Sequence, residues 1–103
     1  MDINKIIGLE GGKDACYFKI LAEEGRGKTK YWPSIKDGKE ISMFGPGGYD
    51  EYLKYKTERE RETIRVVVSG NPCCAQDVVR NILGCKCLAI GPTSLDIFPE
   101  EVI

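Results

Sequence analysis

Cysteine is the residue type in this chain that is best equipped for chemistry. The 103 residues include five cysteines and no histidine, which excludes Ser-His and Cys-His nucleophile pairs and zinc sites with imidazole ligands. Cys73 and Cys74 directly follow Asn71-Pro72, a signal for the start of a helix. Because the positive end of a helix favours a thiolate, one hypothesis is a sulfur-transfer or redox factor that uses these two cysteines. Cys74 lies on the apolar face of the predicted helix, so Cys73 is the expected exposed thiol.

The loop in front of this helix offers a second kind of site. Ser69, Gly70 and Asn71 connect a predicted strand to the predicted helix, and open α/β sheets bind ligands at such connections. Free backbone N–H groups at a helix start attract anions. The sequence therefore predicts an anion-binding site at these three residues. The simpler alternative is that Cys74 is a small core residue and Cys73 an incidental neighbour.

A metal site built from the cysteines is not expected. The predicted helix over residues 72–83 spans about 18 Å, so Cys73 and Cys85 should lie at its opposite ends. Four sulfurs around one zinc ion lie within about 4 Å of each other. The sequence therefore predicts no metal and no cofactor. Since residues 1–7 lack a signal-peptide pattern, we expect free thiols and a cytoplasmic location.

A short basic and aromatic segment suggests a different class of function. Basic side chains next to aromatic rings can bind single-stranded nucleic acid through phosphates and bases. The residues concerned are Arg26, Lys28, Lys30, Tyr31 and Trp32. The net charge is only −1, and two glutamates precede the segment. The preferred interpretation is a solvated hairpin whose aromatic side chains pack into the core. The sequence therefore does not favour nucleic acid as a partner.

The elements that position these residues are clearest in the second half of the chain. The continuous apolar stretch at residues 64–69 predicts a buried central strand. A helix over residues 72–83 should follow, because Asn71 can cap it and Gly84 can end it. Its expected inward face has helical spacing: Cys74, Ala75, Val78, Val79 and Ile82. With a strand at residues 85–90 this forms a β-α-β unit, whose two strands should be parallel with a right-handed crossover if they share one sheet.

The first half reads as an antiparallel β-meander. The predicted strands are residues 3–9, 15–22, 30–32 and 40–44, with a loop at 24–28 and a hairpin turn at Asp37-Gly38. A glycine-rich break at 45–48 precedes one exposed, charged helix at 49–62. The fold class is therefore α+β in a single domain, residues 1–103.

The C-terminal tail, residues 92–103, is more apolar than a solvated tail should be. Its large apolar side chains include Ile97, Phe98, Val102 and Ile103. Either the tail folds back onto the sheet, or these residues bind a partner.

Composition favours a soluble protein with 42% hydrophobic and 30% charged residues. The leading hypothesis is a small cytoplasmic accessory or regulatory protein that binds a protein partner or a second copy of itself, without catalysis and away from membranes. The low charge of residues 63–103 supports it, because a partner could cover such a surface. The thiol-dependent factor and the single-stranded nucleic-acid-binding module are the alternatives.

Overall fold

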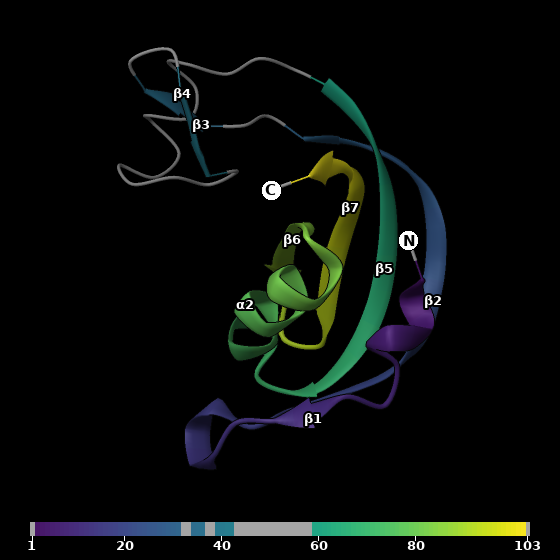
Figure 1. Cartoon of the computed structure of the whole chain (residues 1–103), viewed down its shortest axis with the longest axis vertical. Helices are drawn as coiled ribbons and strands as arrows, with labels where there is room; N and C mark the ends of the chain where they lie inside the picture. Colours follow the sequence, from purple (N-terminus) through teal and green to yellow (C-terminus); the bar gives the residue numbers. More distant parts are fainter. Residues whose placement is uncertain (1, 32–33, 37–38, 43–58, 103) are drawn as a thin grey trace. The chain divides into compact units, whose positions relative to one another are not determined.

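The apolar stretch around Val66 lies in the middle of an antiparallel sheet, as its continuous hydrophobicity predicts (Figure 1). The computed structural model describes residues 2–31, 34–36, 39–42 and 59–102. Within these ranges, the sheet has five strands in the order β1-β2-β5-β7-β6. Their bounds are Glu10–Gly11 (β1), Phe18–Tyr31 (β2), Arg59–Gly70 (β5), Cys85–Ile90 (β6) and Ser94–Val102 (β7). With the helix α2, Pro72–Leu83, this confirms the α+β class.

The chain divides into two compact units, Met1–Gly27 with Glu62–Ile103, and Lys28–Arg61. The second unit contains a two-stranded antiparallel hairpin of β3, Ser34–Lys36, and β4, Lys39–Ser42. Lys36 lies opposite Lys39, so the two strands are joined across the predicted turn Asp37-Gly38, which is outside the described residues. The single-domain assignment stays a prediction.

Helix α2 has the bounds that its sequence signals predict. The Asn71 side chain accepts a hydrogen bond from the Cys73 N–H at 3.0 Å, and Pro72 occupies the first turn. At the other end Gly84 adopts a left-handed φ of 69° and its N–H donates to the Arg80 carbonyl. Each of these contacts satisfies backbone groups that a helix end leaves free, which is why the local sequence determines both boundaries.

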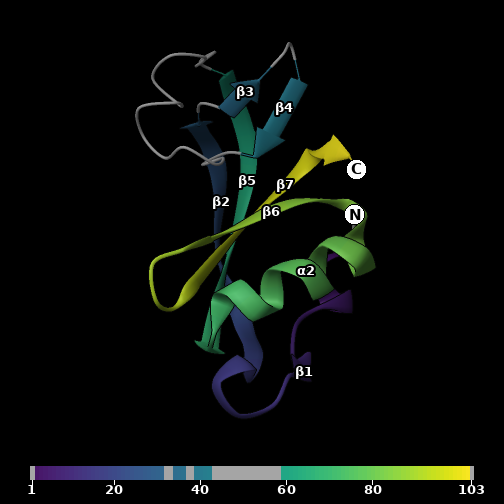
Figure 2. The same cartoon turned by 90° about the vertical axis from the view of Figure 1, so that its left-hand side faces the viewer.

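The inward face of α2 is narrower than predicted. Ala75 and Val79 are fully buried, whereas Val78 is 36% and Ile82 39% exposed. The prediction that Val78 and Ile82 point into the core is therefore wrong. Of the two strands at this end of the sheet, α2 packs more closely against the edge strand β6 than against β7 (Figure 2). A helix at the edge of a sheet buries only the part of its apolar stripe that faces inward.

Two polar side chains of α2 also cover the outer edge of β6. Gln76 accepts a hydrogen bond from the Ala89 N–H at 2.9 Å, and Arg80 donates to the Cys87 carbonyl at 2.8 Å. Strand edges with free backbone groups promote association with other chains. The helix thus satisfies backbone groups that β6 would otherwise offer to another strand.

The C-terminal tail folds back and becomes β7, between β5 and β6. Ile97 lies opposite both Ile64 of β5 and Cys87 of β6. Because β7 is antiparallel to both neighbours, β5 and β6 are parallel, as the β-α-β prediction requires, with one strand inserted between them. Ile97 and Phe98 are fully buried and therefore belong to the chain's own interior, which corrects their assignment as partner-binding residues.

The rest of β7 carries one buried charge and an exposed end. Asp96 is fully buried and accepts two hydrogen bonds from the Arg65 guanidinium, at 2.7 and 3.0 Å. Val102 is 77% exposed, and Ile103 lies outside the described residues. Only Val102 among the predicted partner-binding residues is thus seen at the surface.

The predictions for the first 62 residues are wrong in three places. Residues 3–9 are not a strand, since Ile3–Lys5 form the 3₁₀ helix η1, capped by the Asp2 side chain. Residues 24–28 are not a loop but part of β2. The end of the predicted charged helix, residues 59–62, belongs to β5. Residues 45–58, with the predicted glycine-rich break and the rest of that helix, lie outside the described residues.

The other strand predictions agree with the structure in part. Phe18 and Ile20 share a buried face of β2, as predicted for the strand at 15–22, whereas Ala22 is exposed. The strand predicted at 30–32 is the end of β2 as far as Tyr31. The strand predicted at 40–44 begins one residue earlier, as β4, and residues 43 and 44 lie outside the described residues.

Candidate functional site at the strand-to-helix junction

The junction between β5 and α2 is held against a short N-terminal turn. This turn, η2, spans Asp14–Cys16. The Asn71 N–H donates to the Tyr17 carbonyl at 2.7 Å, and the Asn71 side-chain amide donates to the Ala15 carbonyl at 3.1 Å. Gly70 has a φ of 91° and lies so close to Tyr17 that a side chain there would collide with its carbonyl oxygen. The backbone of the two segments is therefore in direct contact.

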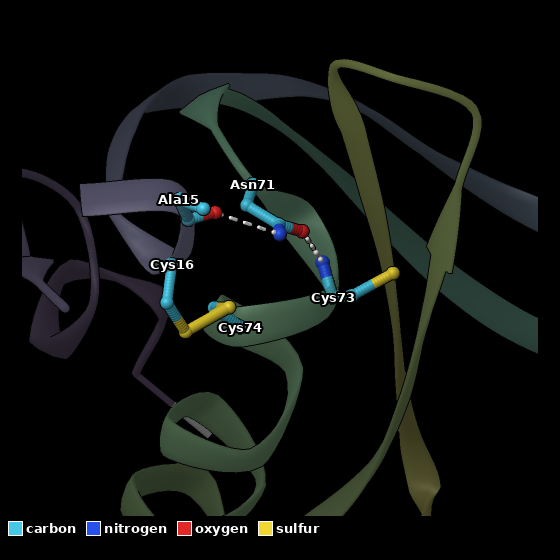
Figure 3. The surroundings of a disulfide bond; sticks show 5 residues. All are labelled: Ala15, Cys16, Asn71, Cys73 and Cys74. Atoms are coloured by element: carbon cyan, nitrogen blue, oxygen red, sulfur yellow. Dashed lines mark hydrogen bonds between the residues drawn. A yellow bond between two sulfur atoms is a disulfide. The ribbon is translucent and has the colours of Figure 1, made fainter. Parts of the chain in front are cut away.

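A disulfide between Cys16 and Cys74 links the same two segments (Figure 3). The two residues are 58 positions apart in sequence, and their Cα atoms are 5.6 Å apart. The expectation of free thiols is therefore wrong for Cys16 and Cys74. Cys16 was assigned to a strand, and no local pattern connects it to Cys74. Only the pairing of distant strands brings them together.

The disulfide is accessible from solvent. Cys16 is exposed and Cys74 is half-buried. Cys74 is the third residue of α2, so its sulfur lies near the positive end of the helix dipole. An exposed disulfide is more readily attacked by thiols than one in a core.

Four backbone N–H groups at the predicted anion site of Ser69, Gly70 and Asn71 already have hydrogen-bond partners within the fold. The Cys73 N–H donates to the Asn71 side chain, and the N–H groups of Cys74 and Ala75 donate to the Asn71 carbonyl at 3.2 and 3.3 Å. The Asn71 N–H is used by Tyr17. An anion at this helix start would have to displace these four hydrogen bonds. Ser69 and Gly70 are exposed, and the anion-binding site stays a prediction.

The three remaining cysteines differ in their surroundings. Cys73 is exposed, and Figure 3 shows its sulfur pointing away from the disulfide. Cys85 and Cys87 are buried beneath α2 on one face of β6. Burial raises the pKa of the Cys87 thiol to about 12, and it also raises the pKa of Cys85. The Cys87 thiol donates to the Gln76 carbonyl at 3.1 Å.

We expect alkylation to separate these thiols. In native protein at pH 7.5, iodoacetamide should modify Cys73 and leave Cys87 intact, because the Cys87 thiol is buried and neutral. Burial of this neutral thiol also makes the free energy of unfolding depend on pH. Its contribution to stability is fully present below about pH 9, the ordinary thiol pKa, and is lost as the pH rises towards 12. Peptide mapping by mass spectrometry measures the first effect, and modification of Cys87 at the rate of Cys73 would contradict it.

The basic and aromatic residues do not form the predicted hairpin loop. Arg26, Lys28, Lys30 and Tyr31 belong to β2, and Trp32 lies outside the described residues. The Arg26 guanidinium forms two hydrogen bonds to the Glu23 carboxylate, at 2.6 and 3.1 Å. Hydrogen bonding to Arg26 lowers the pKa of Glu23. Glu23 therefore offsets part of the charge of Arg26, and the Arg26 side chain stays 58% exposed.

Metal binding and membrane crossing find no candidate in the described part of the chain. It contains no group of three or more acidic, cysteine or histidine side chains that could hold a metal ion. Cys73 and Cys85 lie at opposite ends of α2, as the helix length requires. Among the described helices, none has the length and apolar composition that crossing a membrane requires.

Comparison of the chain with protein families, with characterised proteins and with solved structures finds no match.

Proposed function

We propose that this protein is a small accessory protein without catalysis of its own, which binds another protein chain along the outer edge of β2. The observation that carries the proposal is the exposure of residues 21–28, every one of which is open to solvent in the middle of a 14-residue strand. On the outer side, the described residues pair with β2 only as far as Ile20: β1 lies opposite Phe18 and Lys19, and Gly8 and Leu9 form backbone hydrogen bonds with Ile20. An exposed strand edge is a template for pairing with an added strand.

Two glycines in this segment support close approach by another backbone. Gly25 and Gly27 have no atom within 4 Å of the place where a side chain would begin, and neither has a positive φ. The described part of the fold therefore gives no reason for glycine at either position. Glycine inside a strand often marks a place where a second backbone comes close.

The charges of the segment indicate which partner fits. The order along β2 is acidic at Glu23 and Glu24, then basic at Arg26 and Lys28. A second copy running antiparallel about Gly25 would place Glu24 opposite Arg26 of the other copy, and Arg26 opposite its Glu24. Opposite charges across a strand pair are favourable and like charges are not. A second copy of this chain is therefore the partner that we infer.

Charge reversal tests this pairing. We expect wild-type protein to form a dimer in sedimentation velocity over a concentration series. Glu24→Arg and Arg26→Glu should each weaken it about tenfold, because each places like charges opposite one another at two symmetric positions. The double reversal should restore the dimer. Asp77→Lys, an exposed charge reversal on α2, is the matched control.

The possible outcomes are distinct. Loss of dimer in both single variants with recovery in the double variant supports the proposal. A wild-type protein that is monomeric at all concentrations, or a dimer that is indifferent to all three β2 variants, would overturn it.

A further inference from the structure

We propose that Cys16–Cys74 is a redox-active disulfide that exchanges with dithiols, either small molecules or pairs of cysteines in other proteins. This site is separate from the β2 edge and does not depend on the proposed dimer. It revises the thiol-dependent hypothesis from the sequence, which used Cys73 and Cys74. In the structure, Cys74 is bonded to Cys16 instead.

The first argument is access to one particular sulfur. Cys16 is exposed and belongs to η2, whereas Cys74 is half-buried in the first turn of α2 (Figure 3). Thiol–disulfide exchange requires a thiolate to approach a sulfur directly. An incoming thiolate should therefore attack Cys16.

The second argument concerns the group that leaves. Attack on Cys16 expels the sulfur of Cys74 as a thiolate, near the positive end of α2. Negative charge is stabilised there by the helix dipole. The more exposed sulfur thus receives the attack, and the better-stabilised sulfur leaves.

The third argument is that the two segments are held together without the disulfide. Asn71 donates from its backbone to Tyr17 and from its side chain to Ala15. On either side of this contact, Phe18 and Ala75 are buried in the core. Reduction should therefore leave Cys16 and Cys74 facing one another, ready to close again. If the disulfide alone held the two segments together, reduction would let the two cysteines move apart.

The exchange balances as a two-electron reaction. One thiolate of the dithiol attacks the Cys16 sulfur, the Cys16–Cys74 bond breaks, and the electron pair leaves on Cys74, which then takes a proton. The second thiolate of the dithiol then attacks the other dithiol sulfur, which is bonded to Cys16 in the mixed disulfide. Cys16 leaves as a thiolate and is protonated in turn. The dithiol becomes a disulfide, and the protein gains two electrons and two protons.

Cys73 takes no part in this reaction, although it is adjacent to Cys74 in sequence. Its sulfur points away from the disulfide (Figure 3). Cys73→Ser is therefore a matched control that removes a neighbouring exposed thiol and leaves the exchanging pair intact.

The test uses the full chain, purified without reductant and equilibrated with mixtures of reduced and oxidised dithiothreitol. Thiol trapping and mass spectrometry measure the reduced fraction, and circular dichroism follows the fold. We expect one two-electron transition, with one dithiothreitol oxidised per disulfide reduced and a folded protein at both ends. Cys73→Ser should keep the same midpoint and an exchange rate within twofold of wild type.

Three results would overturn the proposal. Reduction only in denaturant, or unfolding upon reduction, would make the disulfide purely structural. A bond mapped between Cys16 and Cys73 would contradict the assignment of Cys74. A Cys73→Ser variant whose exchange is more than tenfold slower would place Cys73 in the reaction.

Discussion

Replacing Val79 with aspartate is expected to unfold the protein, whereas the same replacement at Val78 should leave it folded. Val79 lies on the inward face of α2 and is fully buried in the hydrophobic core. An unpaired carboxylate there has no hydrogen-bond partner to replace water, which costs several kcal/mol. Small domains are stable by only about 5–15 kcal/mol, so this single change removes much or all of the stability.

Val78 is the matched control because it is adjacent in the same helix and 36% exposed. Its carboxylate would reach water, and the remaining cost is the lower helix propensity and lost apolar contact, about 1 kcal/mol. Urea unfolding followed by circular dichroism measures both variants. If Val78→Asp unfolds the protein and Val79→Asp does not, the orientation of α2 described above is wrong.

Gly70→Ala should destabilise the protein by roughly 3 kcal/mol or more, through two effects at the same residue. The φ of 91° is unfavourable for any residue with a side chain. The added methyl group would also collide with the Tyr17 carbonyl oxygen, and this carbonyl accepts the Asn71 hydrogen bond. Relief of the collision must therefore separate the junction from the N-terminal turn.

Gly84→Ala separates the two effects. Gly84 also has a positive φ, 69°, but no atom lies within 4 Å of an added methyl group. Its cost should be the backbone strain alone, about 1–2 kcal/mol. Thermal unfolding should therefore show a melting temperature for Gly70→Ala clearly below that of Gly84→Ala. Equal losses would mean that the close approach to Tyr17 contributes nothing.

The second half of the chain could be predicted because its local and tertiary signals agree. Asn71, Pro72 and Gly84 determine the ends of α2 through contacts within a few residues, and the flanking strands are apolar enough to be recognised. The rotation of α2 could not be predicted. It depends on which strands the helix packs against, and one of them, β7, has the sequence position of a tail.

The first half was less predictable because its structure depends on distant partners. Gly25 and Gly27 favour a loop when read locally, yet they lie in β2 because β5 runs alongside it. The Cys16–Cys74 pair is a consequence of the same long-range pairing. For the candidate site, the sequence indicated the helix start and one of the two bonded cysteines. It could not indicate that Cys16 is the partner of Cys74.

The position of β7 has a consequence for how this protein is made. The parallel strands β5 and β6 never touch as neighbours, since β7 separates them. During synthesis, β6 is complete once Ile90 has been added, and at that stage β7 is not yet present beside it. The core can close only when Ser94–Val102 has been added and inserted between two strands already present. Until that moment the apolar residues of β5, α2 and β6 that β7 covers are exposed, which makes the nascent chain prone to aggregation until β7 arrives.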